Sequence, residues 1–161
     1  FNLFQPTTQT GIRNELNIDC GGISVEGDRT QLQQAILNLM INARDAMENL
    51  PENSRSLRIR AGLCDAMGVM PNPPTEVKFK GPFCCIRVED SGPGVDEAIV
   101  GKIFEPFFTT KPTGKGTGMG LSMAYGVSRE HGGWIQYERL NPGAAFTIIL
   151  PVLQNEKEHI Q

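Results

Sequence analysis

Apolar residues recur with two different spacings along this chain, and the two spacings separate helices from strands. After Asp28, apolar residues follow one another at helical spacing: Leu32, Ile36, Leu39, Ala43 and Met47. Asp28 with Gln31 forms a capping-box pattern at the start of that run. The sequence therefore predicts an amphipathic helix over residues 28–48.

Five shorter segments have the composition and spacing of strands. They cover residues 13–18, 57–63, 83–89, 134–139 and 145–150. We expect the second and third to pair as a hairpin across a long proline-rich loop. The last two should pair across a turn at Asn141, Pro142 and Gly143.

Two further helices complete the prediction, a short one over residues 96–103 and a longer one over about 120–131. Strands followed by helices, with hairpins among them, favour an α+β fold. We expect a two-layer sandwich in which a mixed, mostly antiparallel sheet of about five strands is covered on one face by about three helices. This domain should span residues 1–153, followed by a frayed tail at 154–161.

Composition excludes several classes of function. The 161 residues are 39% hydrophobic, enough for one domain with a core, and the net charge of −3 argues against nucleic-acid binding. The four cysteines have neither CxxC spacing nor a neighbouring histidine, which argues against a metal site and predicts reduced thiols. No run is long enough to span a bilayer, and residues 1–9 lack a signal-peptide pattern. We therefore expect a cytoplasmic location, with any membrane anchor outside these residues.

Two asparagines on the first predicted helix are candidate metal ligands. Asn38 and Asn42 lie four residues apart, so they share a helix face with Gln31 and Asp45, beside an apolar surface. Burying an unpaired amide costs about 1–3 kcal/mol, so something should satisfy these side chains. An amide oxygen suits Mg²⁺, although both asparagines could instead bond neighbouring backbone or water.

A turn with the sequence DSGPG follows the third predicted strand. The Asp90 carboxylate can accept a hydrogen bond from an exocyclic amine such as adenine N6, while Gly92 and Gly94 let the backbone pass close to a flat ligand. The same residues are also typical of an ordinary turn at a strand end.

A glycine-rich segment, GKGTGMG, precedes the last predicted helix. The start of a helix offers free N–H groups and a positive dipole end, which bind phosphate oxygens. Lys111 and Lys115 could add phosphate contacts. The segment lacks the Walker A pattern and does not follow a strand as a Rossmann loop does. We expect Phe104, Phe107 and Phe108 to anchor the base of this loop in the core.

Taken in order, these segments resemble the catalytic and ATP-binding domain of sensor histidine kinases. That family shares its Bergerat-type fold with DNA gyrase, MutL and the ninety-kilodalton heat-shock chaperones. Residues 38–46 match the N box, 90–94 the G1 box, 104–108 the F box and 116–121 the G2 box. The GDRTQLQQ and HGGW segments resemble the nitrogen-regulatory type.

The resemblance implies roles for individual residues. Asn42 would coordinate Mg²⁺, Asn38 would support the metal-phosphate site, and Asp90 would recognise adenine. Together with Lys111 and Lys115, which the loop itself suggests, the residues expected at the nucleotide are Asp90, Gly92, Gly94, Gly116, Thr117, Gly118, Met119, Gly120 and Leu121. ATP-hydrolysing relatives carry a glutamate where Asn38 stands, and asparagine cannot act as that base.

The implied activity is transfer of the ATP γ-phosphoryl group to a histidine on a dimerisation domain of the same protein. A response-regulator receiver domain would be the second partner, the isolated domain would be monomeric and the full-length protein homodimeric. The acceptor motif HExxNPL is absent, and His131 and His159 do not match it. We therefore expect the chain to begin after the acceptor domain, with its first helix cut short at Phe1. The final turn, PGAAF, also departs from the GxGTxF of many relatives.

The competing interpretation is a nucleotide-binding module without transfer activity, whose lid controls a partner interface.

Overall fold

The computed structural model describes residues 11–154, so the expectations for Phe1 and for residues 155–161 lie outside the described part. Five strands form one sheet in the order β1-β2-β3-β5-β4. They are β1 (Arg13–Ile18), β2 (Ser56–Leu63), β3 (Phe83–Asp90), β4 (Trp134–Arg139) and β5 (Ala144–Pro151). Only β1 pairs parallel, with β2, and every other pairing is antiparallel. The mixed sheet and both predicted hairpins are thus confirmed.

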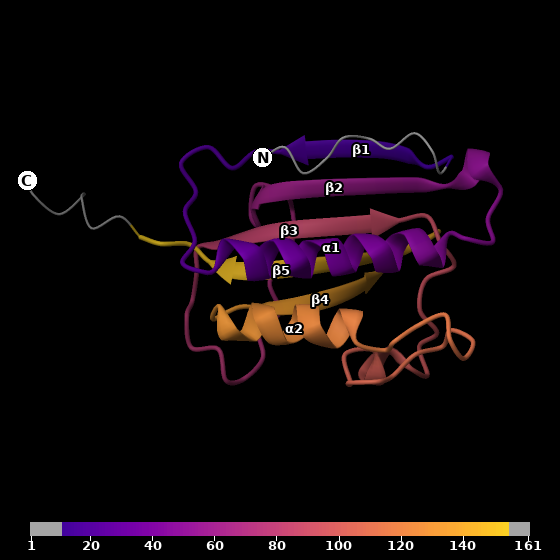
Figure 1. Cartoon of the computed structure of the whole chain (residues 1–161). Coiled ribbons are helices and arrows are strands. Elements are labelled where there is room, and N and C mark those ends of the chain that lie inside the picture. Colours follow the sequence, from indigo (N-terminus) through magenta and orange to yellow (C-terminus); the bar gives the residue numbers. More distant parts are fainter. Residues whose placement is uncertain (1–10, 155–161) are drawn as a thin grey trace, which may run out of the picture.

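Two α-helices cover one face of this sheet (Figure 1). They are α1 (Arg29–Ala46) and α2 (Gly120–Glu130), and they pack against each other as well as against the strands. The predicted short helix over residues 96–103 is wrong. That segment forms successive tight turns, closed by bonds from Ile99 N to Asp96 O and from Lys102 N to Ile99 O. Within that segment only Val100–Lys102 is a 3₁₀ helix, so residues 11–154 contain two α-helices, not about three.

The core lies between the helices and the sheet because the strands alternate apolar and polar residues. Ile59, Val88 and Ile148 point to the helical side, where Leu39 of α1 and Ala124 of α2 meet them. Leu39 is completely buried, which contributes about 1.5–3 kcal/mol relative to an exposed side chain.

The opposite face of the sheet carries a second, smaller apolar cluster. The long loop between β2 and β3 folds back over Cys85, Trp134 and Ile149 and adds Val69 to them. Gln136 of β4 fixes the loop, since its Oε1 accepts a bond from Asn72 N and its Nε2 donates to Met70 O. All four cysteines of the chain are free thiols.

His131, directly after α2, ties the end of α2 to the start of α1. Asp28 caps α1 by accepting a bond from Gln31 N at 2.9 Å, as half of the predicted capping box requires. The other half differs, because the Asp28 N–H donates to His131 Nε2 at 2.9 Å. His131 Nδ1 lies 2.7 Å from Val127 O, which makes Nδ1 the protonated nitrogen. Among residues 11–154, no helix is long and apolar enough to cross a membrane.

Candidate nucleotide site

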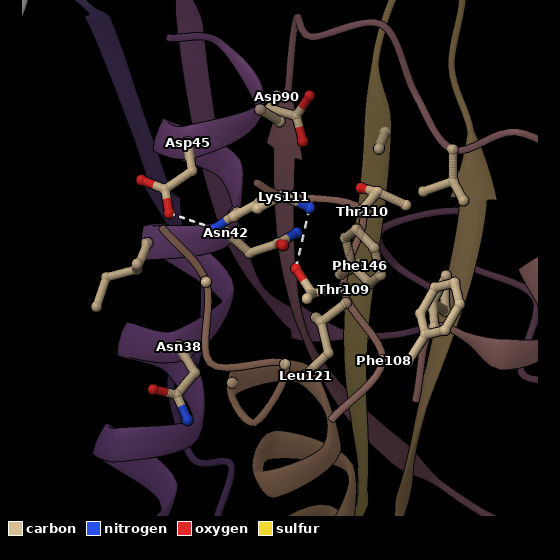
Figure 2. Close-up of a pocket in the computed structure, with 18 of the residues that line it drawn as sticks. Asn38, Asn42, Asp45, Asp90, Phe108, Thr109, Thr110, Lys111, Leu121 and Phe146 are labelled. Atoms are coloured by element: carbon tan, nitrogen blue, oxygen red, sulfur yellow. Dashed lines mark hydrogen bonds and ion pairs between the residues drawn. The ribbon is translucent and has the colours of Figure 1, made fainter. Parts of the chain in front are cut away.

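A cavity of about 770 Å³ opens between α1, the end of β3 and the start of α2. The segment from Ser91 to Met119 curves around its mouth. This cavity brings together segments that are far apart in sequence (Figure 2). It is lined by every residue of the predicted site except Gly92 and Met119: Asn38, Asn42, Asp90, Gly94, Lys111, Lys115, Gly116, Thr117, Gly118, Gly120 and Leu121.

Asp90 is the buried charged group of the cavity. It ends β3 and is 5% exposed. Burial raises the pKa of its carboxyl group from 3.8 to about 6, although backbone N–H groups of Gly92 and Ala144 oppose the shift. Gly92 N donates to Asp90 Oδ1 at 2.8 Å, so the second carboxylate oxygen keeps acceptor capacity for a ligand.

Glycines leave room beside this carboxylate. A side chain at position 92 would begin 2.8 Å from Asp90 Oδ1 and 3.0 Å from Ala46 O, too close for any Cβ. Gly92 therefore shapes the site from outside the cavity lining. Gly94 has φ +76°, in the left-handed region that favours glycine.

The two asparagines project from α1, one turn apart. Asn38 Oδ1 accepts a bond from Gln34 Nε2 at 3.1 Å, a side-chain partner rather than the neighbouring backbone or water considered from the sequence. Asn42 lines the cavity, and its amide has no hydrogen-bond partner within residues 11–154. The Asn42 oxygen is thus available to a ligand or metal, whereas Gln31 lies away from the cavity.

The loop from residue 109 to 119 lines part of the cavity wall. Lys111 Nζ lies 2.5 Å from Asp45 Oδ2, while Lys115 and Glu48 approach only to 4.0 Å. Burial alone would raise the pKa of Asp45, but the bonds from Lys111 and Arg44 outweigh burial and lower it. Asp45 was noted on the asparagine face of α1, yet nothing in the sequence linked it to Lys111.

One aromatic residue of the FEPFF segment differs from expectation. Phe104 stacks on Tyr125 at 5.2 Å and Phe108 lines the cavity, so both anchor the loop as predicted. Phe107 is 76% exposed and does not enter the core. Its N–H donates to Gly118 O at 2.9 Å with φ at +65°, and this left-handed backbone turns the ring outward.

The apolar walls of the cavity were not predicted. Val95, Ile99, Ile103 and Phe146 supply them and give a flat base apolar surface to contact. Ile99 and Ile103 fall within residues 96–103, which were predicted as a short helix. A ligand with a flat apolar body, an exocyclic amine and an anionic tail fits this arrangement.

Comparison with known proteins identifies the family. Residues 27–154 match the family described as histidine kinase-, DNA gyrase B-, and HSP90-like ATPase. The sensor kinase CckA of Brucella abortus is 42% identical over 148 residues, which cover 89% of this chain and 15% of that protein. The sensory histidine kinase/phosphatase NtrB of Rhizobium leguminosarum is 33% identical, over 80% of this chain and 32% of that protein.

Solved structures agree with the sequence relatives. The nucleotide-free catalytic domain of histidine kinase ThkA superposes with a TM-score of 0.65 at 32% identity, covering 89% of this chain and 82% of that one. The mycobacterial sensor histidine kinase MprB, at 24% identity and a TM-score of 0.66, shares the fold over 91% and 86% of the two chains. The present chain spans less than a third of the length of CckA and NtrB. It belongs to the histidine kinase-, DNA gyrase B- and HSP90-like ATPase family, as an ATP-binding catalytic domain of the sensor histidine kinase type.

Proposed function

We propose that this domain holds Mg²⁺-ATP in the cavity and transfers the γ-phosphoryl group to a histidine of a helical dimerisation domain in the same protein. The observation that carries the proposal is the buried Asp90 carboxylate at one end of the cavity, with the Asn42 amide and the glycine loop lining the rest. A response-regulator receiver domain would then take the phosphoryl group, in a homodimeric, cytoplasmic assembly.

Adenine specificity falls to Asp90. Its second carboxylate oxygen can accept a bond from the exocyclic amine of adenine, and the absence of a Cβ at Gly92 leaves the carboxylate uncrowded. Guanine presents a carbonyl oxygen where adenine has that amine, so a carboxylate would repel it. The apolar walls from Ile99 and Phe146 favour a flat base.

The donor set at Asn42 fits a magnesium ion that relies mainly on phosphates and water. Residues 11–154 contain no cluster of three or more His, Cys, Asp or Glu side chains suited to a metal. A single amide oxygen matches the one or two protein ligands that Mg²⁺ usually takes beside substrate phosphates. When bound, the ion would neutralise the negative charge that builds up between the phosphates.

The start of α2 is arranged to receive phosphates. No side chain caps this helix, so its first N–H groups remain available to a ligand. Because Gly120 lines the cavity, this positive end of the helix lies at the cavity. Thr117 Oγ1 accepts a bond from Met119 N, which holds the backbone just before the helix. Catalysis would rest on positioning and electrostatics, as in other phosphoryl transfers.

Asn38 favours transfer to histidine over hydrolysis of ATP. An amide cannot take the proton of water or a hydroxyl group, so it cannot serve as a general base. An imidazole needs no such base, because its neutral form is already nucleophilic near neutral pH. The intramolecular bond from Gln34 Nε2 to Asn38 Oδ1 gives Asn38 a positioning role on α1.

Incubation with radiolabelled ATP tests the proposal. The domain is mixed with the four-helix dimerisation domain from its own protein, and with a variant of that domain lacking the acceptor histidine. We expect label only on the unaltered acceptor, stable in base and lost in acid, as phosphohistidine is. ATP binding without any label would instead establish the nucleotide-binding module, and acid-stable label would indicate a serine or threonine acceptor.

A further inference from the structure

An ion pair joins the loop of residues 109–119, hereafter the lid, to α1. Lys111 Nζ lies 2.5 Å from Asp45 Oδ2 (Figure 2). Arg44 Nη2 lies 2.8 Å from Asp45 Oδ1. The Asp45 and Lys111 side chains are 23% and 34% exposed, so water screens the pair less than it screens ordinary surface charges. Lys111 was predicted to contact phosphate, whereas Asp45 has no role in the site described above beyond lining it.

The backbone and the aliphatic stem of Lys111 are also held in place. The backbone N–H of Lys111 donates to Thr109 Oγ1 at 3.1 Å, which fixes the backbone at the base of the lid. A Cβ at Gly116 would lie 2.8 Å from Lys111 Cδ, so the lysine stem packs directly on the glycine backbone. The contact therefore fixes two points of the lid, Lys111 and Gly116, relative to α1.

The same ammonium group faces the phosphate end of the cavity. Lys111, Gly116 and Asn42 line one side together, and Asp45 adds a negative charge beside them. A polyphosphate arriving there would compete with Asp45 for Lys111, because one ammonium cannot fully neutralise both. Lysine suits such an exchange, since it is a point charge on a flexible stem rather than a planar fork.

We propose that Asp45 is a positioning residue that acts through Lys111, holding the lid against α1 in the nucleotide-free domain and releasing the lysine to the polyphosphate of the bound nucleotide. This inference rests on the proposed function, because it takes ATP as the ligand of the cavity. It makes Asp45 a residue that restrains nucleotide binding, whereas a residue that assists magnesium would promote it.

Trypsin reports on the nucleotide-free lid. Lys111 precedes Pro112, which blocks cleavage there, so the Lys115–Gly116 bond is the tryptic site within the lid. Partly exposed ion pairs contribute up to about 1 kcal/mol, or about fivefold in an opening equilibrium. We expect Asp45→Asn to accelerate this cleavage about two- to fivefold, and Lys111→Gln to do the same. The double variant should be cleaved no faster than either single one.

Glu48→Gln is the matched control, because Glu48 lies three residues after Asp45, just beyond the end of α1, and approaches Lys115 only to 4.0 Å. It should leave cleavage within twofold of the parent. Unchanged cleavage in Asp45→Asn, or additive effects in the double variant, would overturn the proposal. This arm needs no nucleotide, so it stays decisive even if the domain bound no ATP.

Calorimetry with Mg²⁺-ADP, Mg²⁺-ATP and AMP supplies the second arm. Asp45→Asn should bind both polyphosphates about two- to fivefold more tightly, with little change for AMP, which lacks the β- and γ-phosphates. Lys111→Gln should bind the polyphosphates more weakly. Weaker polyphosphate binding by Asp45→Asn would show that Asp45 supports the nucleotide or its metal, and would overturn the restraining role.

Discussion

At the scale of single residues, the buried Asp90 carboxylate is suited to nucleotide binding but lowers the stability of the nucleotide-free domain. A carboxylate that is 5% exposed, without a cationic partner, is costly to keep charged, and its pKa of about 6 expresses that cost. The sequence located this residue correctly at a strand end, because Asp, Ser and Gly predict a turn there. Its burial depends on Ala46 of α1 and Ala144 of β5, so no local pattern could reveal it.

Replacing Asp90 with asparagine should stabilise the nucleotide-free domain. The raised pKa means that the folded state binds a proton more tightly than the unfolded state, so the charged form opposes folding above pH 6. At pH 7.5 the gain should approach an upper limit of about 3 kcal/mol, shrinking as the pH falls from 6 towards 4. Urea unfolding of parent and variant at pH 7.5 and 4.5 measures it. A gain independent of pH would contradict this account.

The same substitution should weaken nucleotide binding. A hydrogen bond to a charged acceptor contributes about 1.5–3 kcal/mol, so affinity for ADP should fall by roughly one to two decades. Parent affinity should also decline below pH 6, as the carboxyl group takes up a proton. Calorimetry with ADP and GTP provides the comparison. ADP binding equal to that of the parent, or GTP binding as tight as ATP, would make Asp90 only a turn residue.

Asn42→Ala should remove the metal-dependent part of ATP binding and abolish transfer. The change deletes a cavity-facing amide that has no partner in residues 11–154, so the free energy of unfolding should hardly change. Titrating Mg²⁺ at fixed ATP tests this, with Gln31→Ala, on the same helix but away from the cavity, as control. An unaltered metal dependence would return Asn42 to a structural role.

At the scale of elements, the sequence predicted secondary structure correctly where one local spacing pattern was strong. The helical spacing from Leu32 to Met47 predicted α1 to within two residues at either end. It failed at residues 96–103, where Ile99 and Ile103 share a helical spacing but line the cavity from successive turns. Phe107 escaped prediction for a similar reason, since its left-handed backbone is set by the long-range bond to Gly118 O. Tertiary contacts overrode the local pattern in both places.

Gly118→Ala should disrupt the lid more than the fold. Gly118 has φ +66°, and a Cβ there would overlap the backbone of Phe107. Left-handed backbone costs a non-glycine residue about 1–2 kcal/mol before that overlap is counted. We expect ATP affinity to fall at least tenfold, while Gly126→Ala, inside α2 with open space around it, should add about 0.5–1 kcal/mol of stability. Calorimetry and urea unfolding separate the two effects, and unaltered ATP binding in Gly118→Ala would contradict the first.

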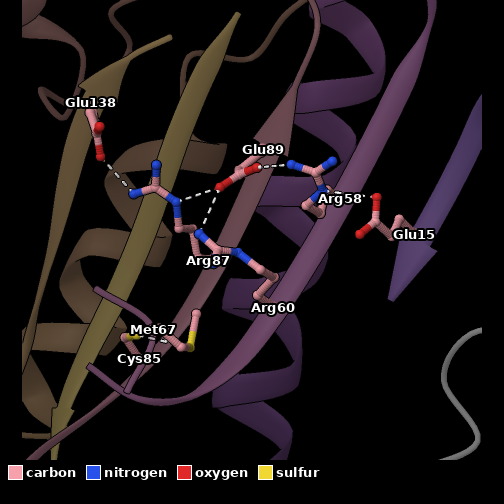
Figure 3. A network of polar contacts seen from close by, with 8 residues as sticks. All are labelled: Glu15, Arg58, Arg60, Met67, Cys85, Arg87, Glu89 and Glu138. Atoms are coloured by element: carbon pink, nitrogen blue, oxygen red, sulfur yellow. Dashed lines mark hydrogen bonds and ion pairs between the residues drawn. The ribbon is translucent and has the colours of Figure 1, made fainter. Parts of the chain in front are cut away.

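At the scale of the whole molecule, the two faces of the sheet differ, and the main apolar core lies on the same face as the cavity. The helical face carries the cavity, and the other carries an alternating network of arginines and glutamates across β1 to β4 (Figure 3). Glu89 Oε1 accepts from Arg87 Nε at 2.6 Å and from Arg60 Nη2 at 3.1 Å. The burial of Glu89 and Arg87 follows from their neighbours on adjacent strands, which no local pattern in the sequence reveals.

Glu89 and Asp90 should therefore give the domain opposite responses to pH. Burial alone would raise the pKa of Glu89, but Arg87 and Arg60 outweigh it and lower the pKa below its ordinary 4.5. Glu89 thus stabilises the fold above pH 4.5 and loses this contribution as the pH falls through its lowered pKa, whereas the Asp90 penalty disappears over a higher range.

Glu89→Gln should destabilise the domain at pH 7.5 by about 3 kcal/mol, because the Arg87 side chain, only 7% exposed, loses its closest anionic partner. The matched control is Glu15→Gln, whose side chain is 58% exposed and pairs with Arg58, so it should cost less than about 1 kcal/mol. Urea unfolding at pH 7.5 gives both values, and equal losses would show that burial of the network contributes nothing. ADP affinity should stay within twofold of the parent, since Glu89 faces away from the cavity; a larger loss would mean that this network also holds Asp90, its neighbour on β3, in position.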